Sequence, residues 1–216
     1  MKLSEPGVQA VLETGKAMVD SGLVAGTWGN ISVRSGTDAF IITPSGMPYH
    51  DLTADDLVMV DLEGKVVQGR RKPSSEINLH KAIYRERRDI QGIVHTHSLY
   101  ASAFAVTRKP LPPISEEMAQ ILGGEVRVAP YAPAGTVELA DAAVKTLGNS
   151  AAVFLANHGL VGVGRTLGEA FLVCQIVEKG AHTYLLSQLM GKPYLLTDED
   201  VFALRKNYVE SYGQKG

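Results

Sequence analysis

Residues 92–97 constrain the fold of this chain more than any other segment. The apolar run Gly92-Ile93-Val94 predicts a buried β-strand, which His95-Thr96-His97 continues. Successive side chains on a strand alternate between faces, so His95 and His97 are expected to project the same way. Two imidazoles on one face supply two of the three protein ligands that a catalytic zinc ion needs. The competing interpretation is one buried, hydrogen-bonded histidine beside a solvated one.

A second segment predicts the start of a helix. Pro73-Ser74-Ser75-Glu76 opens the stretch 77–88, and Pro, Ser and Glu in this order are typical of a helix N-terminus. Ser74 or Ser75 would cap the helix, with Glu76 near the positive end of its dipole. Alternatively, the free N–H groups and the serine hydroxyls bind an anion such as phosphate. His80, one turn beyond Glu76, is expected at the surface or in a structural role, and could support a site at Glu76 from behind.

Three polar turns complete the set of candidate site segments. Gly29-Asn30-Ile31-Ser32 leads into one predicted strand, Thr43-Pro44-Ser45-Gly46 follows the next, and Asn157-His158-Gly159 joins two apolar runs. Loops rich in Gly, Ser, Thr and Asn present amides and hydroxyls to anions. His158 at its bend could complete a histidine triad. Each segment by itself is equally compatible with an ordinary turn.

The remaining pattern predicts alternating helices and strand clusters. A mostly antiparallel sheet flanked by helices is indicated by strand pairs at 31–34 with 39–42, 58–61 with 65–67, and 151–155 with 160–163. Helices are predicted at 4–20, 137–147 and 166–189, the last from the capping box that Thr166 and Glu169 form. No repeat or linker divides the chain, so residues 1–216 are expected to form one domain.

Taken in order, the five polar motifs resemble the class II aldolase and adducin family, and within it the bacterial L-fuculose-1-phosphate aldolases. The similarity runs from Gly26 to Gly213. It implies a three-layer α/β/α fold, with a mobile tail from about 205 to 216. It also implies a homotetramer whose active sites lie between neighbouring subunits.

The resemblance assigns roles to the motifs. Zn²⁺ would be held by His95, His97 and His158, and Glu76 would lie at the metal and act as the proton-transferring acid/base. Tyr212 in the tail would also act in catalysis. The substrate phosphate would be bound by groups of Asn30, Thr43, Ser45, Gly46, Ser74 and Ser75. The implied reaction is a reversible retro-aldol cleavage of a ketose 1-phosphate, such as L-fuculose 1-phosphate, to dihydroxyacetone phosphate and a small aldehyde.

Elementary chemistry fits those roles. The cleavage must stabilise an enediolate, and zinc held by three neutral imidazoles keeps its positive charge and open positions for this purpose. A carboxylate within about 3 Å of the reacting carbon can carry the proton. A phosphate bound away from the reacting bond would position that carbon.

Two departures from the aldolase pattern keep other reactions open. Glu116-Glu117-Met118 stands where the aldolases carry a tyrosine, and Glu117 resembles the catalytic glutamate of the methylthioribulose-1-phosphate dehydratases. Ala134 replaces an aromatic residue of the acceptor pocket. Two alternatives are a dehydratase and a decarboxylase of a phosphorylated keto acid. A third is a ribulose-phosphate 4-epimerase, although those enzymes carry Asp at the position of Glu76. The fourth is a non-catalytic scaffold like adducin, although adducin lacks the three histidines.

Composition bears on partners and on compartment. A net charge of −2 gives no electrostatic case for binding nucleic acid or an anionic membrane. No apolar run reaches the roughly 18 residues of a membrane span, and the N-terminal residues do not resemble a signal peptide. The single cysteine, Cys174, cannot form a disulfide within the chain and is expected in the core. These features are consistent with a cytoplasmic domain, and the resemblance implies that its partner is a small phosphorylated sugar.

Overall fold

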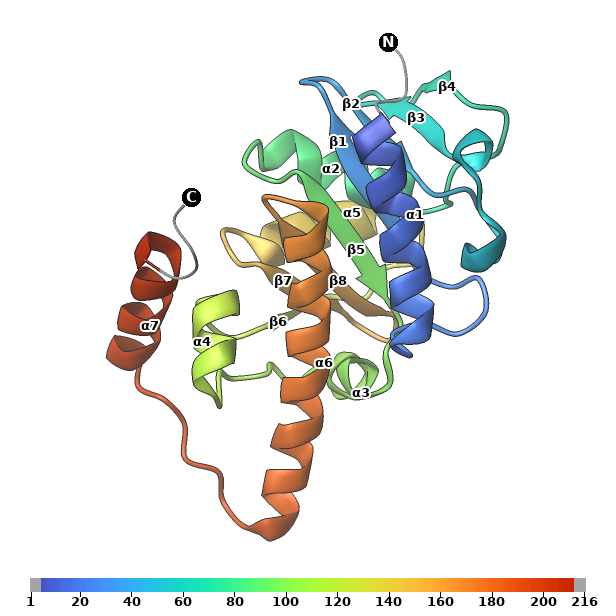
Figure 1. Ribbon diagram of the computed structural model, residues 1–216. Coiled ribbons are helices and arrows are strands. Elements are labelled where there is room, and N and C mark those ends of the chain that lie inside the picture. Colours follow the sequence, from blue (N-terminus) through green and yellow to red (C-terminus); the bar gives the residue numbers. More distant parts are fainter. Residues whose placement is uncertain (1–4, 212–216) are drawn as a thin grey trace.

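A computed structural model of the chain describes residues 5–211 and contains one eight-stranded sheet (Figure 1). The strand order is β4-β3-β2-β1-β5-β8-β7-β6, and only the β6–β7 pair is parallel. The predicted mostly antiparallel sheet is thus confirmed. The strands are β1 (Asn30–Ser35), β2 (Ala39–Ile42), β3 (Val58–Asp61), β4 (Val66–Gln68), β5 (Gly92–Thr96), β6 (Arg127–Ala129), β7 (Ala152–Leu155) and β8 (Gly159–Gly164).

Helices cover both faces of the sheet and form three layers, as predicted (Figure 1). One face packs against α1 (Glu5–Asp20), α3 (Leu99–Thr107), α4 (Glu116–Leu122) and α6 (Leu167–Met190). The other face packs against α2 (Ile77–Glu86) and α5 (Val137–Leu147). Each face has its own core of apolar side chains, because alternate residues of the central strands point into opposite layers.

Strand β5 lies in the middle of the sheet, between β1 and β8. Ile93 packs into the core beneath α2 and α5, whereas Val94 packs into the core beneath α1 and α6. His95 therefore faces the α2 side of the sheet. In the β1–β5 register, Asn30 is directly opposite His95, so the first residue of β1 meets the end of β5.

The C-terminal region differs from the predicted tail. Residues Asp198–Ser211 form α7, and Arg205 of this helix donates hydrogen bonds to the carbonyls of Gln120 and Ile121 at 2.6 and 2.9 Å. The part of the expected tail from 205 to 211 is therefore helical and attached to the end of α4. The sequence pattern did not indicate α3 or β6, and it indicated α4 only through the alternative that Glu117 is a solvated carboxylate at a helix start. In the part of the chain that is described, no helix is long and apolar enough to cross a membrane.

Candidate active site

The two histidines of the His-x-His motif lie at the end of β5. His95 is completely buried, and its Nδ1 donates a hydrogen bond to the Leu160 carbonyl at 2.9 Å. That bond fixes the imidazole and leaves Nε2 pointing out of the sheet as a possible metal ligand. His97 follows the last residue of β5, and its Nε2 lies 2.9 Å from Nε2 of His95. The predicted common orientation is therefore confirmed.

The turn between β7 and β8 brings a third imidazole to the same place. Asn157 adopts a left-handed backbone conformation (φ 55°), which asparagine tolerates better than most residues. Nε2 of His158 then lies 3.3 Å from Nε2 of His95. Gly159 lets the turn pack closely against the end of β5, because a Cβ at that position would collide with the carbonyl oxygen of Thr96.

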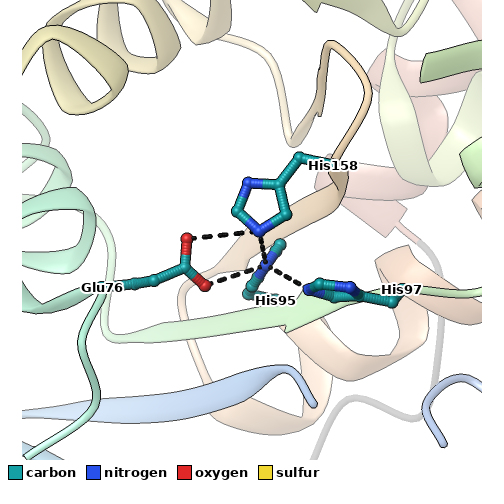
Figure 2. Close-up of side chains that lie close together, drawn as sticks. All are labelled: Glu76, His95, His97 and His158. Carbon is teal, nitrogen blue, oxygen red and sulfur yellow. Dashed lines mark hydrogen bonds and ion pairs between the residues drawn. The ribbon is translucent and has the colours of Figure 1, made fainter. Parts of the chain in front are cut away.

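Glu76 reaches the histidines from the start of α2 (Figure 2). Its Oε2 lies 3.1 Å from Nε2 of His95, and its Oε1 lies 3.5 Å from Nε2 of His158. The helix begins at Ile77 with Glu76 itself as N-cap, so the prediction that Ser74 or Ser75 caps it is wrong. Ser74 instead accepts a hydrogen bond from the Glu76 N–H at 3.3 Å. The glutamate side chain is turned away from the helix end, toward the imidazoles.

Glu76, His95, His97 and His158 fit a metal ion. Their ligand atoms all lie within 4.8 Å of one another. Two zinc–nitrogen bonds of about 2.0–2.1 Å at a tetrahedral angle would separate their nitrogens by about 3.3 Å. The His95–His158 separation of 3.3 Å matches this spacing. Oε1 of Glu76 is buried without a hydrogen-bond partner among the described residues, as expected of an atom that faces an ion.

The protonation states of this cluster favour metal binding. Burial, together with the nearby His95, lowers the pKa of His97 to about 3 and that of His158 to about 4. Both imidazoles are therefore neutral at pH 7 and can donate a lone pair. Burial raises the pKa of the Glu76 carboxyl, but its interactions with His95, His158 and Asn30 outweigh burial and hold the pKa well below its usual range. Glu76 is thus an anion beside the neutral His97 and His158. Burial lowers the pKa of His95, but its interactions with Glu76 and the Leu160 carbonyl outweigh burial and raise that pKa above its usual value.

The residues predicted to bind phosphate lie on segments that meet beside Glu76. The loop 43–46 runs alongside the loop 72–75, joined by hydrogen bonds from Ser74 N to Thr43 O at 3.1 Å and from Ser45 N to Lys72 O at 3.0 Å. Ser45, Gly46 and Ser75 are exposed, whereas Thr43 and Ser74 are buried. Two exposed polar loops therefore flank the metal ligands.

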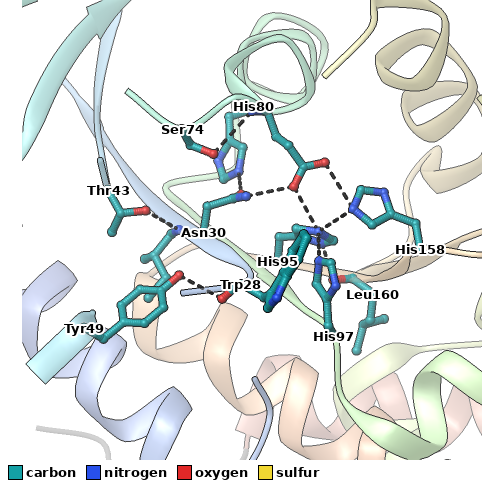
Figure 3. A network of polar contacts seen from close by, with 12 residues as sticks. Trp28, Asn30, Thr43, Tyr49, Ser74, His80, His95, His97, His158 and Leu160 are labelled. Atoms are coloured by element: carbon teal, nitrogen blue, oxygen red, sulfur yellow. Dashed lines mark hydrogen bonds and ion pairs between the residues drawn. The ribbon is translucent and has the colours of Figure 1, made fainter. Parts of the chain in front are cut away.

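Asn30 makes contacts that the sequence did not predict (Figure 3). Its Nδ2 donates to Oε2 of Glu76 at 2.9 Å, and its Oδ1 lies 2.5 Å from Nε2 of His80. His80 is completely buried, so of the two expected positions the surface one is wrong, and the residue lies inside the structure behind Glu76. Its spacing of one helical turn from Glu76 had indicated a position from which it could support that residue.

One residue predicted to be catalytic, Glu117, lies outside the cluster of Glu76 and the three histidines. Glu117 is in the first turn of α4, where its carboxylate pairs with Lys179 of α6 at 2.8 Å, outside the four-residue cluster. Tyr212 lies outside the described residues. Trp28, which was not predicted, stands over the site. Its ring is 66% exposed and 5.5 Å from that of His97.

Comparisons with known proteins agree with this geometry. Residues 9–185 match the family model described as Class II Aldolase and Adducin N-terminal domain. The 5-deoxy-D-ribulose 1-phosphate aldolase of Bacillus thuringiensis serovar kurstaki is 40% identical over 208 residues, which cover 96% of this chain and 97% of that protein. The 5-methylthioribulose-1-phosphate/5-deoxyribulose-1-phosphate aldolase of Rhodospirillum rubrum is 34% identical, covering 94% of this chain and 90% of that one. A solved structure of an L-fuculose 1-phosphate aldolase superposes with a TM-score of 0.92 at 38% identity, covering 96% of this chain and 98% of that chain.

Proposed function

This chain belongs to the class II aldolase and adducin family and is a lyase of the aldolase class, and we propose that it cleaves a deoxyketose 1-phosphate reversibly to dihydroxyacetone phosphate and a short aldehyde. The observation that carries the proposal is the convergence of Glu76 with three imidazoles beside two polar loops. The three relatives above are named for ketose 1-phosphates that have lost a hydroxyl at the far end. We infer a substrate of the same class, with L-fuculose 1-phosphate and 5-deoxyribulose 1-phosphate as candidates.

Zn²⁺ is the cofactor that we propose for the cluster, one ion per subunit. His95, His97 and His158 would hold it, with Glu76 as a further ligand. When bound, the ion would act as a Lewis acid toward negative charge that develops on the substrate oxygens. The Leu160 carbonyl already holds His95 in the tautomer that offers Nε2 outward.

Glu76 is the proposed acid/base. The Asn30 amide holds Oε2 at 2.9 Å, while Oε1 has no hydrogen-bond partner among the described residues. Oε1 can therefore take up a proton from the hydroxymethyl carbon of dihydroxyacetone phosphate and return it. The lowered pKa of this carboxyl means that it is ionised at neutral pH, which is the form that can accept a proton.

The two loops beside Glu76 form the proposed phosphate site. Neutral hydroxyls, amides and backbone N–H groups would bind the anion there. The groups that we assign to it belong to Asn30, Thr43, Ser45, Gly46, Ser74 and Ser75. Because Ser75 and Glu76 are adjacent, a phosphate bound at these loops would fix the distance between the carboxylate and the reacting carbon.

The aldehyde end of the site is proposed to lie between subunits. From the resemblance we infer a homotetramer in the cytoplasm, in which Tyr212 and Glu117 act near the aldehyde. The alternative, a dehydratase of a methylthio sugar phosphate, would require Glu117 as its acid/base. Glu117 pairs with Lys179 instead, and the comparisons name aldolases, so aldol cleavage is better supported.

Proton exchange of dihydroxyacetone phosphate in D2O tests the proposal without a choice of aldehyde. The zinc-loaded protein should exchange one proton at the hydroxymethyl carbon, as followed by proton NMR. The exchange should disappear after chelation and in Glu76→Gln, which keeps the side-chain size but not the base. A fully metallated protein that gives no exchange would count against this donor and favour the chemistry that involves Glu117.

A further inference from the structure

A continuous chain of hydrogen-bonded, buried polar side chains, called here the buried polar file, leads from Glu76 into the core between β1 and α2. Beyond the bond from Asn30 to Glu76, it continues from Asn30 Oδ1 to His80 Nε2 at 2.5 Å and from His80 Nδ1 to Ser32 Oγ at 2.6 Å. It ends at Tyr84, whose hydroxyl lies 2.9 Å from Ser32 Oγ. Asn30, Ser32, His80 and Tyr84 are all at most 4% exposed. No water is needed to connect them.

The chemistry of the groups fixes the direction of every bond in this file. The ionised Glu76 carboxylate only accepts, so the Asn30 amide nitrogen must face it and the amide oxygen must face His80. That oxygen also only accepts, so Nε2 of His80 carries the proton. Burial lowers the pKa of His80 to about 3, so the imidazole is neutral and Nδ1 accepts from the Ser32 hydroxyl. Ser32 in turn accepts from Tyr84.

We propose that His80 is a positioning residue for the aldolase reaction: its Nε2–H holds the Asn30 amide so that the NH2 group faces Glu76. This inference rests on the proposed function, because it assigns Glu76 as the acid/base. A reversed amide would place the Asn30 oxygen against the carboxylate oxygen and repel it. One N–H of Asn30 binds Glu76, and the second is left for the phosphate. A single amide, oriented by His80, would then couple the base to the bound substrate.

An entirely structural role for His80 is less consistent with its surroundings. Leu79 and Ile83, its neighbours on the inward side of α2, are buried apolar residues, and a buried imidazole is stable there only when both nitrogens are hydrogen-bonded. The file makes those bonds and at one end reaches the ionised carboxylate of Glu76. The arrangement resembles the outer contacts that orient metal ligands elsewhere, whose loss costs about 10- to 100-fold in activity or affinity.

Two amide substitutions distinguish the hydrogen bond of His80 to Asn30 from its hydrogen bond to Ser32. In His80→Gln, the terminal amide reaches the position of Nε2 and can still donate to Asn30, but the bond to Ser32 is lost. In His80→Asn, the shorter amide reaches the position of Nδ1 and can accept from Ser32, but nothing donates to Asn30. Ile83→Val, one turn along the same helix, is a control that loosens the core without touching the file.

The readout is deuterium exchange into dihydroxyacetone phosphate by the zinc-loaded full chain, measured with thermal unfolding of each variant. We expect His80→Asn to exchange about 10- to 100-fold more slowly at saturating substrate. His80→Gln should stay within a few-fold of the unaltered chain, and Ile83→Val should exchange at the unaltered rate. Equal rates in both His80 variants would overturn the proposal, whatever their Tm values.

A second measurement does not depend on activity. In the full chain labelled with 15N-histidine, NMR should show the His80 ring protonated at Nε2 and unprotonated at Nδ1. The opposite tautomer would overturn the proposal. An unaltered chain that fails to exchange at all, while His80 shows the expected tautomer, would instead count against the proposed function.

Discussion

At the scale of the residue, Glu76 contacts two groups of side chains that come from distant parts of the sequence. Its Oε2 is shared by His95 of the candidate metal centre and Asn30 of the buried polar file, and its Oε1 faces His158. The low pKa of the carboxyl follows from these partners, which outweigh the effect of burial. The same residue is thus an ionised ligand and a base whose orientation is fixed by an amide.

Cys174 gives a prediction at the same scale. Burial raises the pKa of its thiol to about 12. Because a raised thiol pKa keeps the group protonated at all lower pH values, the thiolate is absent from the folded protein at pH 8. A thiol reagent such as Ellman's reagent should therefore titrate no sulfur in the native protein at pH 8. It should titrate one per chain in guanidinium chloride. Rapid reaction of the native protein would show that Cys174 is accessible.

Sequence reasoning identified the three histidines of the candidate metal site, because each of them lies in a local sequence pattern. His95 and His97 follow from the alternation of a strand, and His158 from a turn between two apolar runs. The position of His80 was left open between the surface and the interior, because its burial depends on Asn30 and Ser32, about 50 residues away in the sequence. The prediction that a serine caps α2 was wrong for a related reason. Sequence rules for helix starts use neighbouring residues only, and they do not include the contacts of Glu76 with the distant His95 and His158.

At the scale of the element, α3 holds the end of β5 in place. The helix starts two residues after His97, and the carboxylate of Glu178 in α6 binds its first turn. Glu178 accepts hydrogen bonds from Ser98 Oγ, Tyr100 N and Ala101 N at 2.7, 2.9 and 2.8 Å. A side chain of α6 therefore replaces a local cap and fixes the segment that carries His97.

Replacing Glu178 with glutamine should destabilise the protein. Gln keeps one acceptor and presents an NH2 group to backbone donors, so we expect a loss of about 2–3 kcal/mol in the free energy of unfolding by urea. Glu210→Gln in the exposed last turn of α7 removes the same charge and should change it by less than about 0.5 kcal/mol. Equal effects of the two substitutions would show that Glu178 does not cap α3.

The elements missed from sequence share a physical cause. Helices α3 and α4 have nine and seven residues, too few for an apolar stripe to stand out. Helix α7 was taken for tail because its attachment depends on Arg205 reaching the carbonyls of α4, a contact between segments about 85 residues apart. The long amphipathic helices α1 and α5, by contrast, were predicted to within a residue of their observed ends.

At the scale of the whole molecule, the site exists only because the sheet order brings distant segments together. Strand β5 lies between β1 and β8, so Asn30, His95 and the turn before β8 share one end of the sheet. Helix α2 adds Glu76 from the layer above that end (Figure 2). The local motifs were readable in the sequence. The strand order that unites them was not predicted, because antiparallel pairs along the sequence are compatible with many strand orders, and the resemblance supplied only the three layers.

We propose that Glu76 and the three histidines form one metal-dependent catalytic centre. Zinc titration of the metal-free full chain, with formation of dihydroxyacetone phosphate from 5-deoxyribulose 1-phosphate as readout, tests it most directly. Activity should start near zero, rise linearly and level off at one zinc per chain. His158→Ala should abolish that rise, while His50→Ala, an exposed histidine outside the cluster, should leave it unchanged. Full activity in the metal-free protein, or an unaltered titration of His158→Ala, would contradict the claim.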